Sequence, residues 1–276
     1  MTAAEVVSVT VGDVLVQSVS DGTGRERASA ALSRVSDPEA WRSRPQYFGA
    51  DDSWEFPLGV QVVRSGEEVV LVDAGYGPGD RGPDYVGGAL LHELRRTGVD
   101  PDAVTQLVFT HFHADHLGWI SEEGEPVFPR AVLRAHVAEW ENAVRRGPAT
   151  ADRDRLLAVA DRFELFDRET TIAPGVDALP APGHTPGSAV YVISSGGERC
   201  LLLGDVAHSP VQLEERDWRV RWDADPELAS ATRNALADEA AATGALVTAS
   251  HFPGLAFGRI TVTGGARRFT VADGNT

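Results

Sequence analysis

The sequence predicts an α/β protein, a four-layer αββα sandwich in which two packed sheets are covered by helices on both outer faces. Three observations support this: hairpin-like pairs of β-rich segments near the N-terminus, helical patterns between strands, and a repeat of that alternation after the middle of the chain. The 276 residues are enough for one large core. No low-complexity linker interrupts them, so we expect a single domain over residues 1–276.

The first expected elements are two β-hairpins. Residues 6–19 form an apolar, β-rich stretch around the turn residues Gly12-Asp13. Residues 60–64 and 69–72 are similarly apolar and flank Ser65-Gly66. Both pairs indicate antiparallel strands joined by short turns.

Three helical patterns are expected between and after the strands, at about 86–96, 137–146 and 227–242. The last has a recognisable start, because Asp225 is a good N-cap and Pro226 is tolerated in the first turn.

Residues 110–116 read Thr-His-Phe-His-Ala-Asp-His and directly follow the apolar run Leu107-Val108-Phe109. Imidazole and carboxylate groups are ligands of zinc, iron and manganese. An extended chain alternates its side chains, so His111 and His113 project to the same side and can hold one ion. Asp115 and His116 follow where the chain should turn, and can face a second ion.

Three further ligand types lie at strand ends downstream. His184 lies in the Gly/Pro-rich turn before the apolar strand 189–193, Asp205 ends the strand 200–204, and His251 follows the apolar segment 244–250. Rigid scaffolds present functional groups at such positions. Four ligand-bearing segments together favour a metal site over isolated structural residues.

From about Pro57 to Gly258 the chain resembles metallo-β-lactamase-fold hydrolases, whose His-x-His-x-Asp-His pattern is intact at His111–His116. The resemblance implies that Asp73, which ends the strand-like segment 70–72, orients the metal-binding loop without being a ligand. The implied ligand set is His111, His113 and His184 for one ion, Asp115, His116 and His251 for the other, and Asp205 bridging both.

Within that superfamily, segments such as Gly118-Trp119 and Ser250–Gly254 resemble the lactonase and organophosphate-hydrolase branch. Lactonases that open acyl-homoserine lactones typically carry a tyrosine three residues after the bridging aspartate. This chain has His208 there, as do members resembling methyl-parathion hydrolase. His208 is expected to donate a hydrogen bond to a developing oxyanion or leaving group; the alternative is that it packs beneath the site.

The resemblance and the ligand chemistry imply a di-metal hydrolase in which a metal-bridging hydroxide opens a lactone, ester or phosphotriester of a small, mostly neutral substrate. Asp115 is expected to pass the proton onward. Zinc is the first expectation for both ions, with manganese, cobalt or iron as alternatives. The alternative functions are a thioesterase resembling glyoxalase II, a β-lactamase, and a non-hydrolytic di-iron protein that handles dioxygen.

Aromatic side chains are expected to form the substrate pocket. Trp119 lies close behind His116 and Phe252 lies beside His251, while Trp54 and Phe56 belong to the aromatic segment 42–56. That segment either covers the metal cleft or forms a homodimer interface, and core packing is the alternative for each ring.

The net charge of −16 argues against a nuclease, which needs a basic surface to hold a polyanion. We expect a small-molecule substrate and no nucleic-acid partner. No stretch approaches the roughly 18 apolar residues of a membrane span. The N-terminus lacks the features of a signal peptide, and the single cysteine, Cys200, excludes an intrachain disulfide. A cytoplasmic protein without a membrane partner is therefore expected.

Overall fold

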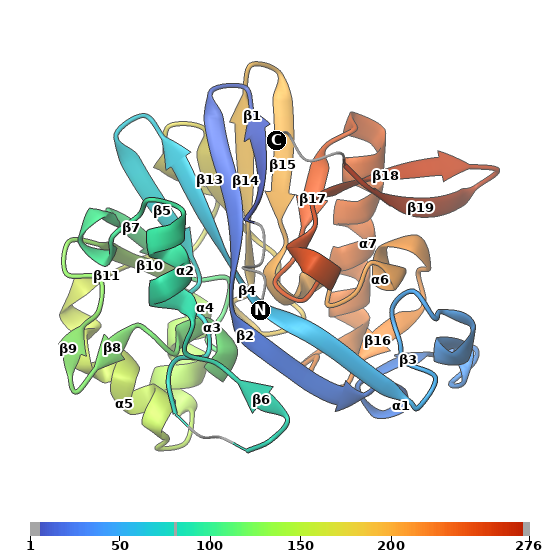
Figure 1. Ribbon diagram of the computed structural model, residues 1–276, viewed down its shortest axis with the longest axis horizontal. Helices are drawn as coiled ribbons and strands as arrows, with labels where there is room; N and C mark the ends of the chain where they lie inside the picture. The colour runs from blue at the N-terminus through green and yellow to red at the C-terminus, as the bar shows by residue number, and fades with distance from the viewer. Residues whose placement is uncertain (1–5, 80–81, 273–276) are drawn as a thin grey trace.

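The computed structural model describes residues 6–79 and 82–272 and contains two large sheets packed face to face (Figure 1). The first sheet runs, in spatial order, β1 (Val7–Val11), β2 (Val14–Arg27), β4 (Ser53–Ser65), β5 (Glu68–Val72), β7 (Gln106–Val108), β10 (Val132–His136) and β11 (Phe163–Phe166), and β6 (Tyr85–Val86) pairs with β2. The second runs β12 (Thr170–Ala173), β13 (Val176–Pro180), β14 (Ala189–Ser195), β15 (Glu198–Leu202), β17 (Leu246–Thr248), β18 (Gly258–Thr263) and β19 (Ala266–Val271).

Helices cover the outer faces of both sheets (Figure 1). On the first sheet these are α2 (Leu90–Arg96), α3 (Ala114–Leu117), α4 (Val137–Trp140), which continues as the π-helix η3 (Glu141–Arg146), and α5 (Ala151–Ala158). On the second they are α6 (Val211–Glu214) and α7 (Pro226–Thr243). The smaller elements are α1 (Ala28–Ala31), β3 (Leu32–Arg34), β8 (Ser121–Glu122), β9 (Glu125–Pro126), β16 (Trp218–Val220) and the 3-10 turns η1 (Ala40–Ser43), η2 (Pro101–Ala103), η4 (Ala160–Arg162), η5 (Gly204–Val206) and η6 (Pro253–Leu255).

Alternating side chains of the central strands separate the layers. In β5, Val70 and Val72 lie in the core between the two sheets, whereas Leu71 packs beneath the outer helices. In β15, Cys200 also faces the inter-sheet core, whereas Leu201 packs in the core shared with α7. Because successive residues of a strand point to opposite faces, one apolar strand contributes to two cores. The predicted αββα sandwich is confirmed.

The expected helices form, with one difference in extent. The C-terminal helix spans Pro226–Thr243, with the Asp225 side chain accepting from Leu228 N at 3.0 Å, and Gly244 ends it with a left-handed φ of 68°. The helix expected from about residue 86 begins only at Leu90, because Val86 pairs with β2 as part of β6.

The first hairpin extends further than the apolar pattern indicates. Strand β2 continues to Arg27 and pairs with β4 from Ser53 onward, so the polar residues after position 19 are also in the sheet. The aromatic segment 42–56 therefore ends inside β4.

Asp21 joins the loops after β5 and after β6 to the first sheet. It lies at a register shift in β2 and is completely buried. One carboxylate oxygen accepts from Tyr76 N at 2.7 Å and Gly77 N at 2.8 Å. The other accepts from Leu90 N at 2.7 Å and from the Trp119 indole at 2.9 Å, and also from Gly88 N at 3.1 Å. All of these donors except Gly88 N are buried, and buried N–H groups require such partners.

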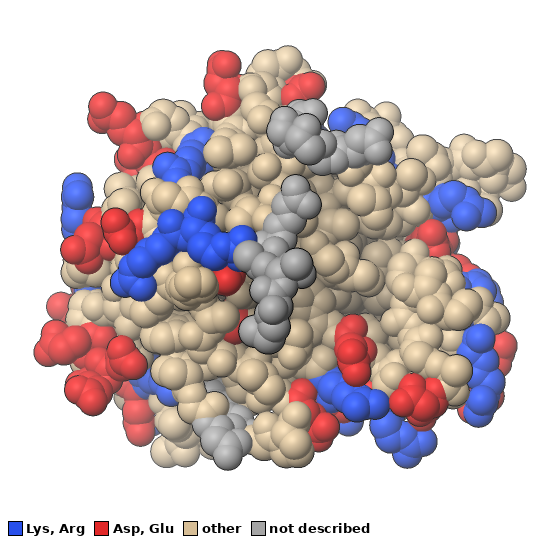
Figure 2. Space-filling view, viewed as in Figure 1, with Lys and Arg blue, Asp and Glu red and all other residues tan. Residues whose placement is uncertain are grey.

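None of the helices in the part of the chain that the structure describes is both long and apolar enough to cross a membrane. Residues 1–5, which carry the expectation about a signal peptide, lie outside the described residues. Acidic and basic side chains are intermixed on the face shown in Figure 2.

Replacing Asp21 by Asn is expected to lower the free energy of unfolding by about 2 kcal/mol or more, because the amide nitrogen would face buried N–H donors. Asp13→Asn makes the same chemical change at an exposed turn and should change it by less than about 0.5 kcal/mol. Urea unfolding monitored by circular dichroism measures both. Equal stabilities of the two variants would contradict the role given to Asp21.

Candidate metal centre

The candidate ligands lie at the ends of strands that meet at one edge of the sandwich. His111 and His113 follow β7, and Asp205 follows β15 in η5. His184 lies in the loop between β13 and β14, and His251 follows β17. Strand β7 is parallel to β5 in the first sheet, and β15 is parallel to β17 in the second. Loops after parallel neighbours emerge on the same side, which brings distant parts of the sequence together.

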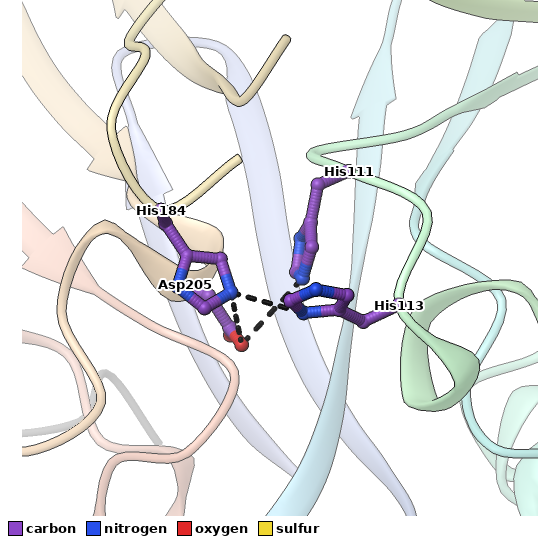
Figure 3. A group of neighbouring side chains, drawn as sticks. All are labelled: His111, His113, His184 and Asp205. Carbon is purple, nitrogen blue, oxygen red and sulfur yellow. Dashed lines mark hydrogen bonds and ion pairs between the residues drawn. The ribbon is translucent and has the colours of Figure 1, made fainter. Parts of the chain in front are cut away.

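Four of these side chains form the first cluster: His111, His113, His184 and Asp205. Their ligand atoms all lie within 4.8 Å of one another, and Figure 3 shows the rings of His111 and His113, which share one loop, converging with His184 and Asp205 from two other segments. His184 Nε2 lies 3.0 Å from His113 Nδ1. Asp205 Oδ2 lies 3.7 Å from His111 Nε2 and 3.5 Å from His184 Nε2.

The second cluster consists of Asp115, His116 and His251, whose ligand atoms are also within 4.8 Å of one another. His251 Nε2 lies 3.5 Å from Asp115 Oδ2. The two clusters share Asp205, since its Oδ1 atom lies 3.3 Å from His116 Nε2 and 3.2 Å from His251 Nε2. One carboxylate therefore turns an oxygen to each cluster. All seven residues that the sequence singles out as ligands lie together.

The donor atoms fit a pair of cations. His111 Nε2, His116 Nε2 and Asp205 Oδ1 are buried and have no hydrogen-bond partner. Buried polar atoms without partners are unfavourable, and imidazole nitrogens and carboxylate oxygens are the donors that zinc and other divalent transition metals take. The convergence of unpartnered donors at these two clusters is the feature that a metal ion would satisfy.

Hydrogen bonds on the outer side of three histidine rings orient their Nε2 atoms toward the clusters. His116 Nδ1 lies 2.8 Å from Asp73 Oδ2, and His251 Nδ1 lies 2.9 Å from the carbonyl oxygen of Pro57. His184 Nδ1 lies 3.1 Å from Asp223 Oδ1. When Nδ1 donates to these acceptors, Nε2 keeps its lone pair for a cation.

Asp73 lies directly after β5 and has a left-handed φ of 68°, which aspartate tolerates better than most residues. Its carboxylate accepts from Thr110 N at 2.7 Å and from Thr110 Oγ1 at 2.8 Å, in addition to contacting His116. Thr110 Oγ1 in turn lies 3.1 Å from His111 Nδ1. Asp73 thus contacts the start of the histidine-rich loop as well as one ring of the second cluster.

The two clusters differ electrostatically. Burial holds the pKa of His111 well below its usual value and lowers the pKa of His113 to about 4. For His116, burial acts in the same direction, but the carboxylates of Asp205 and Asp73 hold its pKa well above the usual value. Burial acts to raise the pKa of Asp205, but the surrounding imidazoles hold it well below its ordinary range. Two rings of the first cluster, His111 and His113, are therefore uncharged at neutral pH and lie beside the Asp205 carboxylate.

A cavity of about 300 Å³ opens onto both clusters. Its aromatic lining comes from Phe56, Tyr76, Tyr85 and Trp222, and its polar lining from His113, Asp115, His184, Asp205, His208 and His251. Of the rings expected in the pocket, Phe56 lines it. Sequence reasoning did not assign Tyr76 or Tyr85 to the pocket, because both lie in segments after β5 with no ligand motif nearby.

The structure corrects three of the expected pocket residues. Trp54 is buried behind Phe56, with ring centroids 4.2 Å apart, and does not line the cavity. Trp119 does not line this cavity: its indole donates to Asp21, and the ring packs in the core beneath the outer helices. Phe252 is completely buried against Phe269 in the core beneath α7. Proximity to a ligand in the sequence does not place a ring in the pocket, because neighbouring residues point to different sides.

His208 lies in the cavity wall and is almost fully buried. Its Nε2 atom is 3.1 Å from Asp205 Oδ2, and its ring stacks on Trp222 with centroids 5.8 Å apart and planes at 26°. Burial lowers the pKa of His208, with Asp205 opposing the shift.

Asp223 is a functional candidate that the sequence did not reveal. The Asp223 side chain contacts the His184 ring. The backbone of its segment also bonds to the His184 loop, since Ala224 N donates to His184 O at 3.0 Å. The only local signal is an acidic residue directly after Trp222, which also suits an exposed turn.

The sequence model of the Metallo-beta-lactamase superfamily matches residues 60–251. An N-acyl homoserine lactonase of Bacillus thuringiensis is 24% identical over 141 residues, which are 51% of this chain and 52% of that protein. The chain thus aligns with about half the length of these curated relatives.

Two solved structures are similar over almost the whole chain. AidC, described as a dizinc quorum-quenching lactonase in complex with a product, is 25% identical with a TM-score of 0.83, covering 97% of each chain. A hydrolase of the β-lactamase superfamily, AbOPH, is 22% identical with a TM-score of 0.87, covering 100% of each chain, and this likeness concerns the fold alone. Because the family match spans residues 60–251, from the core strand β4 to the last candidate ligand, this chain belongs to the metallo-beta-lactamase superfamily.

Proposed function

We propose that this protein is a metal-dependent hydrolase that binds two divalent ions, zinc foremost, and cleaves a lactone, ester or phosphotriester bond in a small, mostly neutral substrate. The observation that carries the proposal is the position of Asp205, whose two oxygens face two separate groups of buried donors. A buried carboxylate shared in this way is suited to bridging a pair of cations. When bound, such ions lower the pKa of water to near 7 and polarise a carbonyl or phosphoryl oxygen.

The proposed ligands are those of the first and second clusters. His111, His113 and His184 would hold one ion, and Asp115, His116 and His251 the other, with Asp205 between them. Asp73 and Asp223 would keep two of the rings in the required orientation by accepting from their Nδ1 atoms.

Two side chains at the cavity are proposed to act on the reacting groups. Asp115 is about one-fifth exposed and lines the cavity, so it can accept a proton and return it to the leaving group. His208 also lines the cavity and contacts Asp205. It can donate a hydrogen bond to a substrate oxygen that gains negative charge. No serine or cysteine nucleophile is needed, and Cys200 lies in the inter-sheet core.

The cavity favours a substrate with an apolar part. Phe56, Tyr76, Tyr85 and Trp222 provide an aromatic surface next to the polar donors, and this surface can bind an acyl chain or aryl group while excluding water. Similarity to N-acyl homoserine lactonases and to the dizinc lactonase AidC makes lactones the first substrates to examine.

Metal loading combined with a substrate panel tests the proposal. The zinc-, manganese- and cobalt-loaded protein is assayed with acyl-homoserine and simple lactones, aryl esters, phosphotriesters, thioesters and a β-lactam. We expect hydrolysis of lactones or esters that chelation abolishes and metal restores. Preferential turnover of the thioester or β-lactam would instead support one of the other hydrolase classes. A fully loaded protein that cleaves no member of the panel would contradict the proposal.

Replacing His113 by Ala is expected to remove metal and to lower kcat/KM by more than about 100-fold, since it deletes a donor of the first cluster and not only an outer partner. His92→Ala is the matched control, because the His92 side chain is 77% exposed on α2. Elemental analysis and initial rates are measured on both variants. Full metal content and activity in His113→Ala would exclude it as a ligand.

For His208, replacement by Ala is expected to lower kcat by about 100-fold while both metal ions are retained, because a donor to the developing charge is lost. KM should change less than kcat. Metal content checks that the loss does not arise from Asp205, which His208 contacts. An unchanged kcat would assign His208 to packing alone.

A further inference from the structure

Glu139 is a buried carboxylate that is neither one of the proposed metal ligands nor one of the groups proposed to act on the substrate. It lies on α4, is only 2% exposed, and is outside both clusters. One oxygen accepts from Phe112 N at 2.9 Å. The other accepts from Thr185 Oγ1 at 2.6 Å and from Gly187 N at 3.2 Å.

These three donors belong to the two loops that carry the histidines of the first cluster. Phe112 stands between His111 and His113, and Thr185 directly follows His184. The first loop follows β7 of the first sheet, whereas the second joins β13 and β14 of the second sheet. A single side chain, Glu139, is therefore hydrogen-bonded to both halves of the sandwich, next to the candidate ligands of the first cluster.

Close packing maintains this arrangement. A Cβ atom on Gly187 would lie 2.1 Å from the backbone nitrogen of Glu139, so the absence of a side chain lets the loop approach α4. The helix changes to π geometry directly after Trp140, a rare conformation that often accompanies functional positions. Burial raises the pKa of Glu139, and its hydrogen bonds from Thr185, Phe112 and Gly187 oppose that shift.

We propose that Glu139 is a positioning residue that sets the spacing between the His111–His113 loop and the His184 loop, and thereby tunes the affinity of the first cluster for its metal ion. The proposal rests on the proposed metal site. His184 Nε2 and His113 Nδ1 come from opposite loops and lie 3.0 Å apart, so a small shift of either loop changes the site directly. Asp73, by contrast, contacts the ring of His116 itself.

The decisive variant is Glu139→Gln, which keeps the size of the side chain but replaces one acceptor oxygen by a donor. In either orientation of the amide, Phe112 N or the pair Thr185 Oγ1 and Gly187 N would face an N–H group. Glu141→Gln is the matched control: it makes the same change two residues later, at a side chain that is 32% exposed and paired with Arg145.

The first measurement needs no metal. Hydrogen exchange of backbone amides, followed by NMR on the metal-free protein, is expected to become about tenfold faster at Phe112 or Gly187 in Glu139→Gln, as one lost hydrogen bond implies. Glu141→Gln should match the wild type at both amides. Unchanged exchange at both positions in folded Glu139→Gln would overturn the proposal, whatever the protein binds.

The second measurement is zinc affinity by competition with a chelator. Glu139→Gln is expected to bind its first zinc ion about 10- to 100-fold more weakly than wild type, the usual effect of losing an outer support. Thr185→Val, which removes the hydroxyl's contacts with Glu139 and Ser188 while keeping the shape of the side chain, should shift the affinity in the same direction by less. Thr185→Val also provides the test if Glu139→Gln fails to fold. Affinities within twofold of wild type in both variants would overturn the proposal, whereas a wild type that binds no zinc would refute the metal site itself.

Discussion

The structure depends on one electrostatic constraint: Asp205 keeps a negative charge inside the protein, surrounded by imidazole rings. Its pKa is held well below the ordinary range although burial alone would raise it. An ionised carboxylate is costly to bury unless positive charge or donors compensate for it. The Nδ1 atoms of His116 and His184 face acceptors of their own, Asp73 and Asp223, which leaves the Nε2 lone pairs and the Asp205 oxygens for bound cations, whose positive charge would compensate the carboxylate. The fold thus places the imidazole rings around Asp205 and places hydrogen-bond acceptors on the outer side of those rings.

Much of this could be predicted from the sequence, because the ligands are marked by local patterns. The His111–His116 motif is contiguous, and His184, Asp205 and His251 each follow recognisable apolar or Gly/Pro-rich segments. The same holds for the sandwich, since strands that are apolar throughout, such as residues 69–72, must bury both faces. What local pattern cannot provide is the partner of a side chain. Asp223, and likewise Glu139, look like ordinary acidic residues until the fold brings the His184 loop against them.

The pocket was the least predictable part for a related reason. Trp119 and Phe252 are sequence neighbours of the candidate ligands and were therefore predicted to line the substrate pocket, yet both pack in hydrophobic cores. Two of the rings that do line the cavity, Tyr76 and Tyr85, lie close in sequence to backbone N–H groups that donate to Asp21, those of residues 76–77 and 90. Such long-range hydrogen bonds leave no periodic pattern in the sequence, so the place of these two tyrosines in the cavity wall could not be predicted from it.

Two of the cavity's aromatic residues immediately precede an outer partner of a candidate ligand. Phe56 is followed by Pro57, whose carbonyl faces His251, and Trp222 is followed by Asp223, which faces His184. Backbone adjustments that refit either ring to another molecule would also displace a histidine. Divergence of this chain toward new substrates through Phe56 or Trp222 would accordingly alter the orientation of a candidate ligand at the same time.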